Sequence, residues 1–427
     1  MNPITTLPTG GAAIFWGVIT FSLLVFLHEG GHFFAARLFK VKVHEFMLGL
    51  PGPGFRVRSK RSGTSYGVSL FLLGGYVRIA GMEPGIEDER LCDALGALLA
   101  SRSITAAELS NAIHVPRERA AALLATLEDY GASRLSDDRE TSEALLPETE
   151  EPASETLDRL RAATYRGLPM WKRVTILSMG VLVNIFAAIA ILTLALGIVG
   201  IPTPTLRVAA VTSGGAAEAA GMRVGDTVET LNGKTLPDWM SLKTMLAHSA
   251  PGTAVDITVL RGGRLVTVRV VPTAPESGAG AVLGIMATEK NVAVPWLDAV
   301  GKSFSMTGQV FVAVARFFDP KTFSTSLSSA RSVVGISYEV ASAAQQGPLA
   351  YAWMVALLSL SLGVMNILPL PPLDGGKIAL EFVEALARRP VPRKVALALS
   401  ALGTLLLFSL IFYLMYADVL RYIVHKG

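Results

Sequence analysis

Two histidines and a glutamate stand at the spacing that a catalytic zinc site requires. In His28-Glu29-Gly30-Gly31-His32 the imidazoles are four residues apart, and positions i and i+4 of a helix share one face. Both rings can therefore bind one metal ion while Glu29 is free to handle a water molecule. The pattern predicts zinc-dependent hydrolysis, although the same five-residue pattern also occurs by chance in many chains.

The surroundings of this segment favour a metal site over chance. It lies near the end of an apolar stretch, roughly residues 12–36, that is long enough to cross a bilayer. Ionisable side chains are costly to bury in a membrane, so where they occur they mark functional sites with partners. We therefore expect His28 and His32 to share a partner elsewhere in the chain.

Asp374 is the candidate partner, because catalytic zinc usually has three protein ligands and one open position. It lies in Asn366-Ile-Leu-Pro-Leu-Pro-Pro-Leu-Asp374-Gly-Gly, at the end of a later apolar stretch. The prolines break a helix and the two glycines permit a tight turn, so irregular backbone is expected where it lines a cavity. The alternative is a proline-rich helix end capped by an aspartate.

Composition indicates an integral membrane protein. Hydrophobic residues make up 51% of the 427 residues and charged residues only 17%, against roughly 25% charged in ordinary globular domains. Lys and Arg gather after the first apolar stretch, before the second, and between the third and fourth, which predicts cytoplasmic loops there and both termini outside. The four stretches that can cross a bilayer are about 12–36, 174–200, 351–370 and 395–418.

Charge and cysteine content narrow the function classes. The net charge of +4 is too small to argue for nucleic acid, and the single cysteine, Cys92, excludes a disulfide framework or a cysteine-built metal cluster. We expect Cys92 to be a small core hydrophobe. The histidines of the first apolar stretch are therefore the main candidates for metal binding.

The residue patterns predict a multi-pass α-helical membrane protein with inserted domains. Residues 51–81 suit a β-hairpin or small sheet against the membrane, and 206–273 suit a small β-rich module outside it. The predicted regions are 10–84 (first spanning helix, zinc motif and membrane-associated strands), 85–160 (acidic insert), 166–200 (second spanning helix), 203–290 (β-rich module), 291–350 (interfacial amphipathic segment) and 351–427 (third and fourth spanning helices with the third ligand).

The insert is acidic and helical. Residues 86–160 hold 17 Asp and Glu against 7 Lys and Arg. Thr105 and Glu108 suit a helix capping pair, and the pattern looks like a winged-helix domain, followed by a flexible acidic linker over 136–155. DNA binding needs a basic face, so we expect no nucleic acid here, but a cytoplasmic protein partner or a regulatory role.

Together these motifs resemble the site-2 protease family of intramembrane zinc metalloproteases, in its bacterial RseP-like branch. That family pairs HExxH on one core helix with NxxPxPxxDG on a later one, and both occur here in that order. The segment from Gly74-Gly75-Tyr76-Val77 resembles the branch's membrane-embedded strands, and 206–286 resembles its extracytoplasmic PDZ domain. The chain differs from the family pattern at the start of the second core helix, where it keeps Gly180 and Asn184 but lacks the usual intervening proline. It also has one PDZ-like module where some relatives have two, and it carries the acidic insert.

The resemblance implies a role for each motif residue. Zinc would be held by His28, His32 and Asp374, with Glu29 as general base and then as acid to the leaving amine. Asn184 and Asn366 resemble asparagines that handle substrate near the site, with hydrogen bonding between helices as the alternative for each.

A substrate helix would have to unwind before attack, because its carbonyls are hydrogen-bonded internally. The strand-rich segment 66–80 could receive it by strand addition, with Gly74 and Gly75 permitting close backbone approach. The implied substrates are single-pass membrane proteins, such as membrane-bound anti-sigma factors or signal-peptide remnants. The implied location is the bacterial inner membrane, with the active site near the cytoplasmic side.

Two other classes of function stay open. A membrane-anchored zinc peptidase of soluble or misfolded chains would need the His-Glu-His motif outside the hydrocarbon, and its position directly after Leu23–Leu27 argues against that. A catalytically silent PDZ scaffold would not need the intact His-Glu-His-Asp set.

Overall fold

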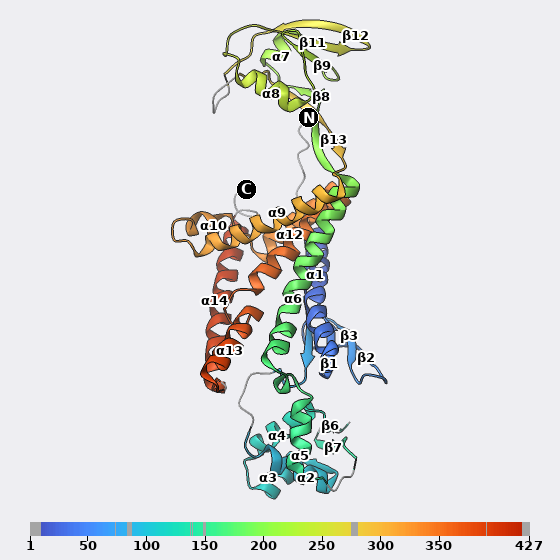
Figure 1. Cartoon of the computed structure of the whole chain (residues 1–427), viewed down its shortest axis with the longest axis vertical. Helices are drawn as coiled ribbons and strands as arrows, with labels where there is room; N and C mark the ends of the chain where they lie inside the picture. The colour runs from blue at the N-terminus through green and yellow to red at the C-terminus, as the bar shows by residue number, and fades with distance from the viewer. Residues whose placement is uncertain are drawn as a thin grey trace. The chain divides into compact units, whose positions relative to one another are not determined.

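A computed structural model describes residues 10–72, 74–82, 88–136, 138, 140–147, 151–274, 281–389 and 391–420. The chain divides into two compact units (Figure 1). Unit 1 comprises Met1–Leu192 and Val300–Gly427, and unit 2 comprises Thr193–Ala299. Each is described by itself.

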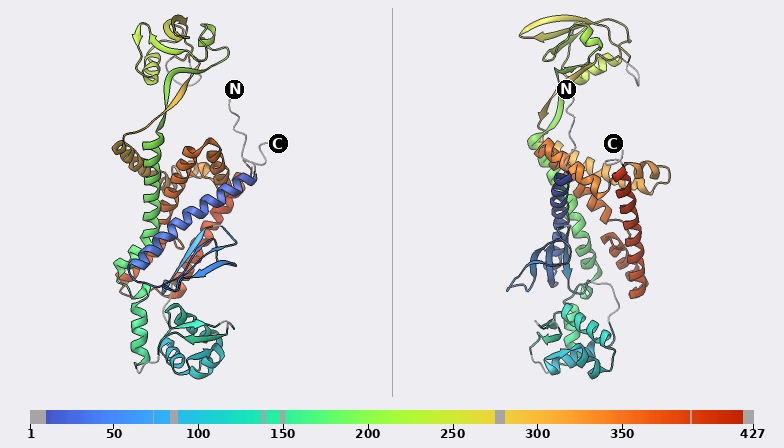
Figure 2. Two further views of the ribbon diagram at one scale, coloured as in Figure 1. Left: turned by 90° about the vertical axis from the view of Figure 1, so that its right-hand side faces the viewer. Right: turned by 180° about the vertical axis from the view of Figure 1, so that it is seen from behind.

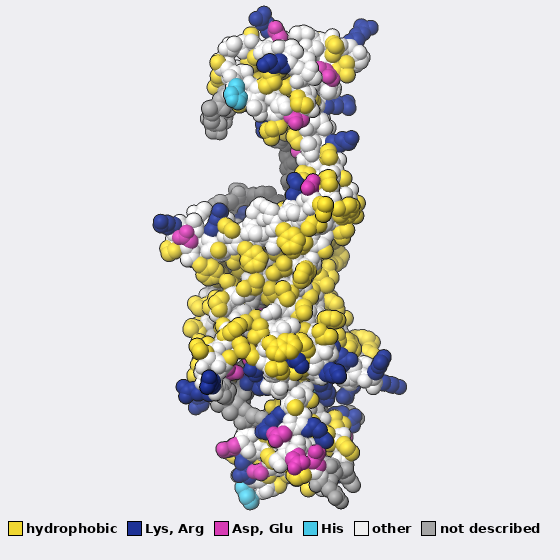
Figure 3. All heavy atoms as spheres, viewed as in Figure 1, with side chains coloured by type: hydrophobic (Ala, Val, Ile, Leu, Met, Phe, Trp, Pro, Cys, Tyr) yellow, Lys and Arg dark blue, Asp and Glu magenta, His cyan; other side chains and the backbone are white. Residues whose placement is uncertain are grey.

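Within the described residues, four helices are long and apolar enough to cross a membrane. They cover Gly10–Leu38, Met170–Val199, Pro348–Ile367 and Lys394–Val419. The corresponding elements are α1 (Gly10–Leu38), α6 (Met170–Leu194) continued by the π-helical turn η2 (Ala195–Val199), α12 (Pro348–Asn366) and α14 (Arg393–Val419). All four predicted spans are confirmed within a few residues. Figure 3 shows hydrophobic side chains gathered over the spanning helices of unit 1.

A four-stranded sheet lies along α1 (Figure 2). Its strands are β1 (Val43–Leu48), β2 (Gly54–Arg58), β3 (Ser65–Ser69) and β4 (Gly75–Ile79), in the order β2-β3-β1-β4. β1 and β3 are parallel, and the other pairs are antiparallel. The end strand β4 is next to α1, because the Val77 N–H of β4 donates to Glu29 of α1, and just before β4 Ser22 Oγ of α1 donates to the Leu72 carbonyl. The predicted small sheet is confirmed, with β1 as an additional strand.

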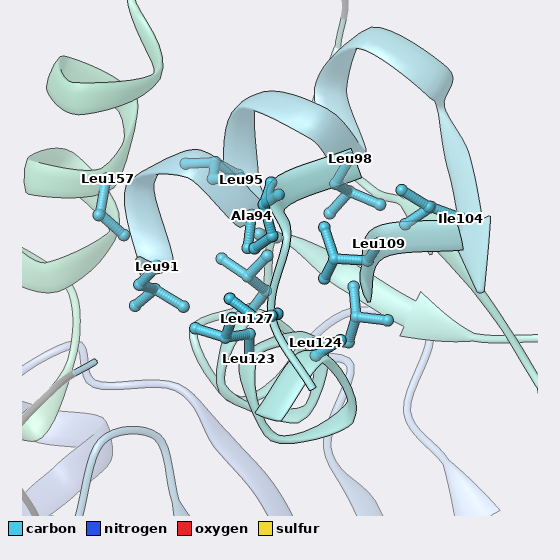
Figure 4. Close-up of a cluster of buried hydrophobic side chains, with 14 residues drawn as sticks. Leu91, Ala94, Leu95, Leu98, Ile104, Leu109, Leu123, Leu124, Leu127 and Leu157 are labelled. Atoms are coloured by element: carbon cyan, nitrogen blue, oxygen red, sulfur yellow. The ribbon is translucent and has the colours of Figure 1, made fainter. Parts of the chain in front are cut away.

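The insert has its own core, drawn in Figure 4. Thr105 and Glu108 form the predicted capping box at the start of α3, and Gly131, with φ of +82°, follows the end of α4. The predicted flexible linker is wrong in part, because its residues include the middle strand of the sheet β5-β7-β6. The elements are α2 (Leu91–Ser101), β5 (Ser103–Thr105), α3 (Ala106–Ile113), α4 (Arg117–Asp129), β6 (Ser133–Leu135), β7 (Thr141–Ala144) and α5 (Ala153–Ala162).

The predicted interfacial segment consists of helices. These are α9 (Trp296–Ala315), η3 (Arg316–Phe318), α10 (Phe323–Ser329) and α11 (Val333–Gln346). A Cβ added at Gly17 of α1 would overlap Ser337 of α11, so these two helices pack as closely as glycine allows. After α12, a proline-rich turn leads into α13 (Asp374–Ala387). The interfacial position of α9 and α10 stays a prediction.

Unit 2 is an antiparallel sheet with two short helices and a separate hydrophobic core. The strand order is β12-β11-β9-β8-β13, with β10 beside β9. Strand, short helix, strand, helix and two-stranded hairpin follow one another as the sequence predicts. The elements are β8 (Ile201–Val211), α7 (Ala216–Ala219), β9 (Thr227–Leu231), β10 (Lys234–Thr235), α8 (Trp239–Ala247), β11 (Val255–Arg261), β12 (Arg264–Val270) and β13 (Ile285–Val292).

Candidate metal centre

Close helix packing brings the two histidines of α1 to Asp374. His28, His32 and Asp374 are all buried. A Cβ added at Gly31 would lie 2.5 Å from the Met179 carbonyl oxygen, so α1 and α6 meet at a glycine. Asp374 is the first residue of α13, and the next residue, Gly375, lies against the backbone of the preceding proline-rich turn. The three candidate ligands therefore come from two helices far apart in sequence.

Three donor atoms converge on one point. Asp374 Oδ2 lies 2.9 Å from His28 Nε2 and 3.1 Å from His32 Nε2, and the two nitrogens are 3.3 Å apart. Donors at 2.0–2.1 Å from a tetrahedral zinc ion are separated by roughly 3.3 Å, so the set fits such an ion. Among the described residues this is the one group of three or more His, Cys, Asp or Glu side chains able to hold a metal.

The charge at Asp374 also suits a metal ligand. Burial raises the pKa of this carboxyl, but hydrogen bonds with both imidazoles outweigh burial and hold that pKa well below its ordinary value. Lys377 Nζ lies 3.6 Å from Asp374 Oδ1. An ionised carboxylate is the form that binds a cation, so these surroundings suit a metal ligand.

Glu29 lies beside the donor set and is not part of it. It follows His28 on α1, and its Oε2 accepts a hydrogen bond from the Val77 backbone N–H of β4 at 3.1 Å. The sheet therefore fixes the carboxylate of Glu29 next to the predicted ligands. This agrees with the motif, in which the glutamate handles water and does not bind the metal.

α6 packs against both imidazoles and contacts their Nδ1 atoms. His32 Nδ1 is 2.8 Å from the Ile176 carbonyl oxygen, and His28 Nδ1 is 3.4 Å from Asn184 Nδ2. Between them, a Cβ added at Gly180 would lie 2.5 Å from His32 Nε2 and 2.9 Å from His28 Cε1. The sequence pattern singled out Gly180 and Asn184, but a backbone carbonyl such as that of Ile176 leaves no trace in residue type.

The structure does not bring the other predicted site residues into this cluster. Asn366 Nδ2 donates to the Leu362 carbonyl, one turn earlier in its own helix. Gly74, with φ of +97°, approaches Val25 of α1, and Gly75 approaches the Met47 carbonyl of β1. The backbone conformation at Gly74 and the close approach to β1 at Gly75 therefore already favour glycine at these two positions.

A buried His-His-Asp donor set with an adjacent glutamate, carried by a protein with four apolar spanning helices, defines a metal-dependent hydrolase of the membrane. The chain belongs to peptidase family M50, the site-2 protease family, whose model matches residues 16–410. The family and its relatives' names establish a zinc-dependent metalloprotease.

Several relatives cover nearly the whole chain. The zinc metalloprotease RasP of Geobacillus kaustophilus and the regulator of sigma-W protease RasP of Bacillus subtilis are each 26% identical to it, over 95% of this chain and 97% of the relative. The zinc metalloprotease RasP of Shouchella clausii is 28% identical, over 94% of this chain and 97% of the relative.

Proposed function

We propose that this protein is an intramembrane protease that cuts single-pass membrane proteins in or near their transmembrane segments. One observation carries the proposal. His28, His32 and Asp374 place three donor atoms within 3.3 Å of one another, and two of the three lie on a helix that is apolar enough to span a membrane. A site built into a spanning helix suits a substrate that also lies in the membrane.

In this proposal the three donors hold the zinc ion and Glu29 handles protons. A zinc ion held there would supply Lewis-acid chemistry, polarising the scissile carbonyl and lowering the pKa of a water molecule. Glu29 takes a proton from that water and gives it to the leaving amine. The Val77 N–H, which donates to Glu29 Oε2, keeps the carboxylate oriented during both transfers.

The sheet is the proposed receiving surface for an unwound substrate. β4 is an end strand of its sheet and contacts the helix that carries Glu29. An extended segment that pairs with this sheet would regain the backbone hydrogen bonds lost on unwinding, and its scissile bond would lie close to the site. Contacts of Gly74, Gly75 and Asn366 with substrate stay predictions.

The predicted orientation places the active site near the cytoplasmic face of the bacterial inner membrane, with both termini outside. Its support is the charge of unit 1: exposed Lys and Arg side chains occur on and after β2 and at the C-terminal end of α13 (Figure 3). These residues are Arg56, Arg58, Lys60, Arg61, Arg388 and Arg389.

We propose separate roles for unit 2 and for the insert. Unit 2 is proposed to be a PDZ-like domain outside the membrane, supported by its antiparallel sheet with helices α7 and α8. The insert is proposed to be a winged-helix-like domain for a cytoplasmic protein partner, supported by its helix-strand-helix-helix-strand-strand order and the sheet β5-β7-β6. One relative is named for the regulation of a sigma factor, so membrane-bound anti-sigma factors are the proposed substrate class.

The test is Glu29→Gln, which removes the proton acceptor and keeps the size of the side chain. We expect this variant to bind one zinc per chain, as the unchanged protein does, and to cut no substrate. Metal analysis of purified protein and quantitative comparison of membrane-protein fragments in cells measure the two properties. Glu289→Gln, an exposed change on β13, is the matched control and should behave as wild type. A fully active Glu29→Gln protein would refute the mechanism.

A further inference from the structure

One face of α6 meets both candidate zinc-binding histidines. Ile176, Gly180 and Asn184 are spaced four residues apart and therefore lie on the same side of the helix. The outer two contact the Nδ1 atoms of His32 and His28, and Gly180 leaves room for the rings between them. α6 thus contacts the Nδ1 atoms of both imidazoles and packs against the two rings.

The inference rests on the proposed ligand set, in which both histidines bind zinc through Nε2. A neutral imidazole that uses Nε2 for the metal keeps its proton on Nδ1, and that proton needs an acceptor. His32 has one, because its Nδ1 is 2.8 Å from the Ile176 carbonyl oxygen. At the corresponding place of His28, the described part of the chain offers the side-chain amide of Asn184.

The surroundings of the Asn184 amide indicate which of its two end atoms, Oδ1 or Nδ2, faces His28 Nδ1. The residue is fully buried, and its Oδ1 has no hydrogen-bond partner within the described part of the chain. Meanwhile its Nδ2, a donor, is the atom 3.4 Å from His28 Nδ1. The oxygen and nitrogen of an amide are nearly the same size, so a half-turn of the amide exchanges them without moving other atoms. The exchange gives Oδ1 a donor and the His28 proton an acceptor.

We infer that Asn184 is a positioning residue that accepts the Nδ1 proton of His28, so that α6 supplies the acceptors for both zinc-binding histidines. This bond fixes the tautomer and the ring plane of His28 before the metal binds. It also explains why an amide is placed in an apolar helix at this depth.

The alternative, a hydrogen bond between helices, is made by a different atom. Ser359 of α12 donates to the backbone carbonyl of Asn184 at 2.9 Å, and Gly363 of α12 lies against the Asn184 Cβ. Contact between α6 and α12 therefore uses the backbone and Cβ of Asn184, which leaves its amide for His28. A change at Ser359 disturbs the helix contact without touching the imidazole.

The experiment measures zinc affinity in the full-length, detergent-purified protein by competition with a chelator. Asn184→Leu keeps the volume and removes the acceptor, and we expect zinc to bind about 10- to 100-fold more weakly. Asn184→Asp keeps only acceptor atoms, so its affinity should stay within about threefold of wild type or increase. Ser359→Ala should bind zinc as wild type does.

A second measurement separates positioning from general disruption. In cobalt-substituted protein, the visible absorption spectrum of Asn184→Leu should shift relative to wild type. The spectra of Asn184→Asp and Ser359→Ala should resemble the wild-type spectrum. Zinc binding by Asn184→Leu at wild-type strength would overturn the inference. An Asn184→Asp protein that binds zinc about 10- to 100-fold more weakly than wild type would also overturn the inference. This second comparison can be made even if the leucine variant does not fold.

Two further variants show whether the ligand assignment itself is at fault. His28→Ala and Asp374→Ala should each lose zinc. If either binds zinc as wild type does, the proposed ligand set is wrong and the inference about Asn184 falls with it. If both lose zinc while Asn184→Leu keeps wild-type affinity, the ligand set stands and only the positioning role is refuted.

Discussion

Gly180 shows how far the site depends on the absence of a side chain. A Cβ added at this residue of α6 would come within 3 Å of atoms of both imidazoles, so a methyl group cannot share this space with His32 Nε2. Alanine normally stabilises a helix relative to glycine, by roughly 1 kcal/mol. At this position the steric effect opposes that preference.

We therefore predict that Gly180→Ala weakens zinc binding although it favours the helix. The added Cβ would lie 2.5 Å from His32 Nε2, and the surrounding helices cannot move apart without loss of packing. Zinc affinity should fall by about tenfold or more, a loss comparable to that of removing a residue that orients a ligand. Equilibrium zinc competition on purified protein measures it.

The matched control is Gly308→Ala on α9, where an added Cβ meets nothing within 4 Å. This change should leave zinc binding as it is and leave the folded protein as stable or slightly more stable. Equal zinc affinity in both alanine variants would show that α6 is not packed against the imidazoles as closely as described.

At the scale of elements, α13 is held by an ion pair as well as by the metal site. Two turns after Asp374, Glu381 accepts a hydrogen bond from Tyr165 at 3.0 Å and lies 2.9 Å from Arg173 of α6. Burial raises the pKa values of both Glu381 and Tyr165. The pair fixes the direction of α13 and therefore the place where Asp374 enters the site.

Unit 2 contains an ion pair between buried Asp226 and half-buried Arg261, and its pH dependence can be predicted. Arg261 donates to both carboxylate oxygens of Asp226 at 2.8 and 2.7 Å, and the Arg223 N–H donates to Asp226 at 2.8 Å. These bonds, chiefly those from Arg261, lower the pKa of Asp226 below its ordinary value. Its stabilising contribution is complete above about pH 4, the unfolded pKa, and is lost as the pH falls through the lower folded value.

We predict that Asp226→Asn destabilises unit 2 at pH 7 by about 2–3 kcal/mol and weakens its acid sensitivity. Hydrogen exchange of β9 and β11 in the full-length protein, measured at neutral and acid pH, reports both effects. Asp256→Asn is the control, because Asp256 and Arg269 are 3.8 Å apart on the surface and such pairs contribute little. Equal exchange in the two variants would contradict the prediction.

The sequence was sufficient for elements whose signals are local. The four spans follow from long apolar runs, and the start of α3 follows from Thr105 and Glu108. β1 was missed because it is an inner strand whose partners, β3 and β4, come later in the chain. β7 was missed because it lies in an acidic, Pro-containing tract whose composition is typical of linkers.

The same distinction between local signals and contacts made by packing applies to the candidate metal site. Residue type and spacing predict His28, Glu29, His32 and Asp374 as site residues, and the structure places the first, third and fourth together with Glu29 beside them. The contacts that orient them come from the Ile176 carbonyl and the Val77 N–H, which every residue type offers. Such contacts follow only from the packing of α6 and β4 against α1.

At the scale of the whole molecule, the connection to unit 2 suggests a clean deletion. β8 and β13 pair antiparallel along their length, and Pro202 lies opposite Asn291. The chain therefore enters and leaves this unit at neighbouring positions. A short Gly-Ser turn that replaces 203–290 would join Pro202 to Asn291 while leaving the metal-site residues in place.

We predict that this deletion removes a filter on substrate size. In the proposed topology unit 2 is tethered outside the membrane, where a folded domain can exclude bulky ectodomains, so without it full-length substrates should be cut before any other protease has shortened them. Immunoblots of a tagged single-pass substrate, in cells that lack the protease that trims it, measure the change. The same deletion combined with Glu29→Gln should give no product, which ties the cleavage to this site. If the deletion protein still requires a trimmed substrate, the domain acts in another way, such as capture of the new C-terminus in a peptide groove.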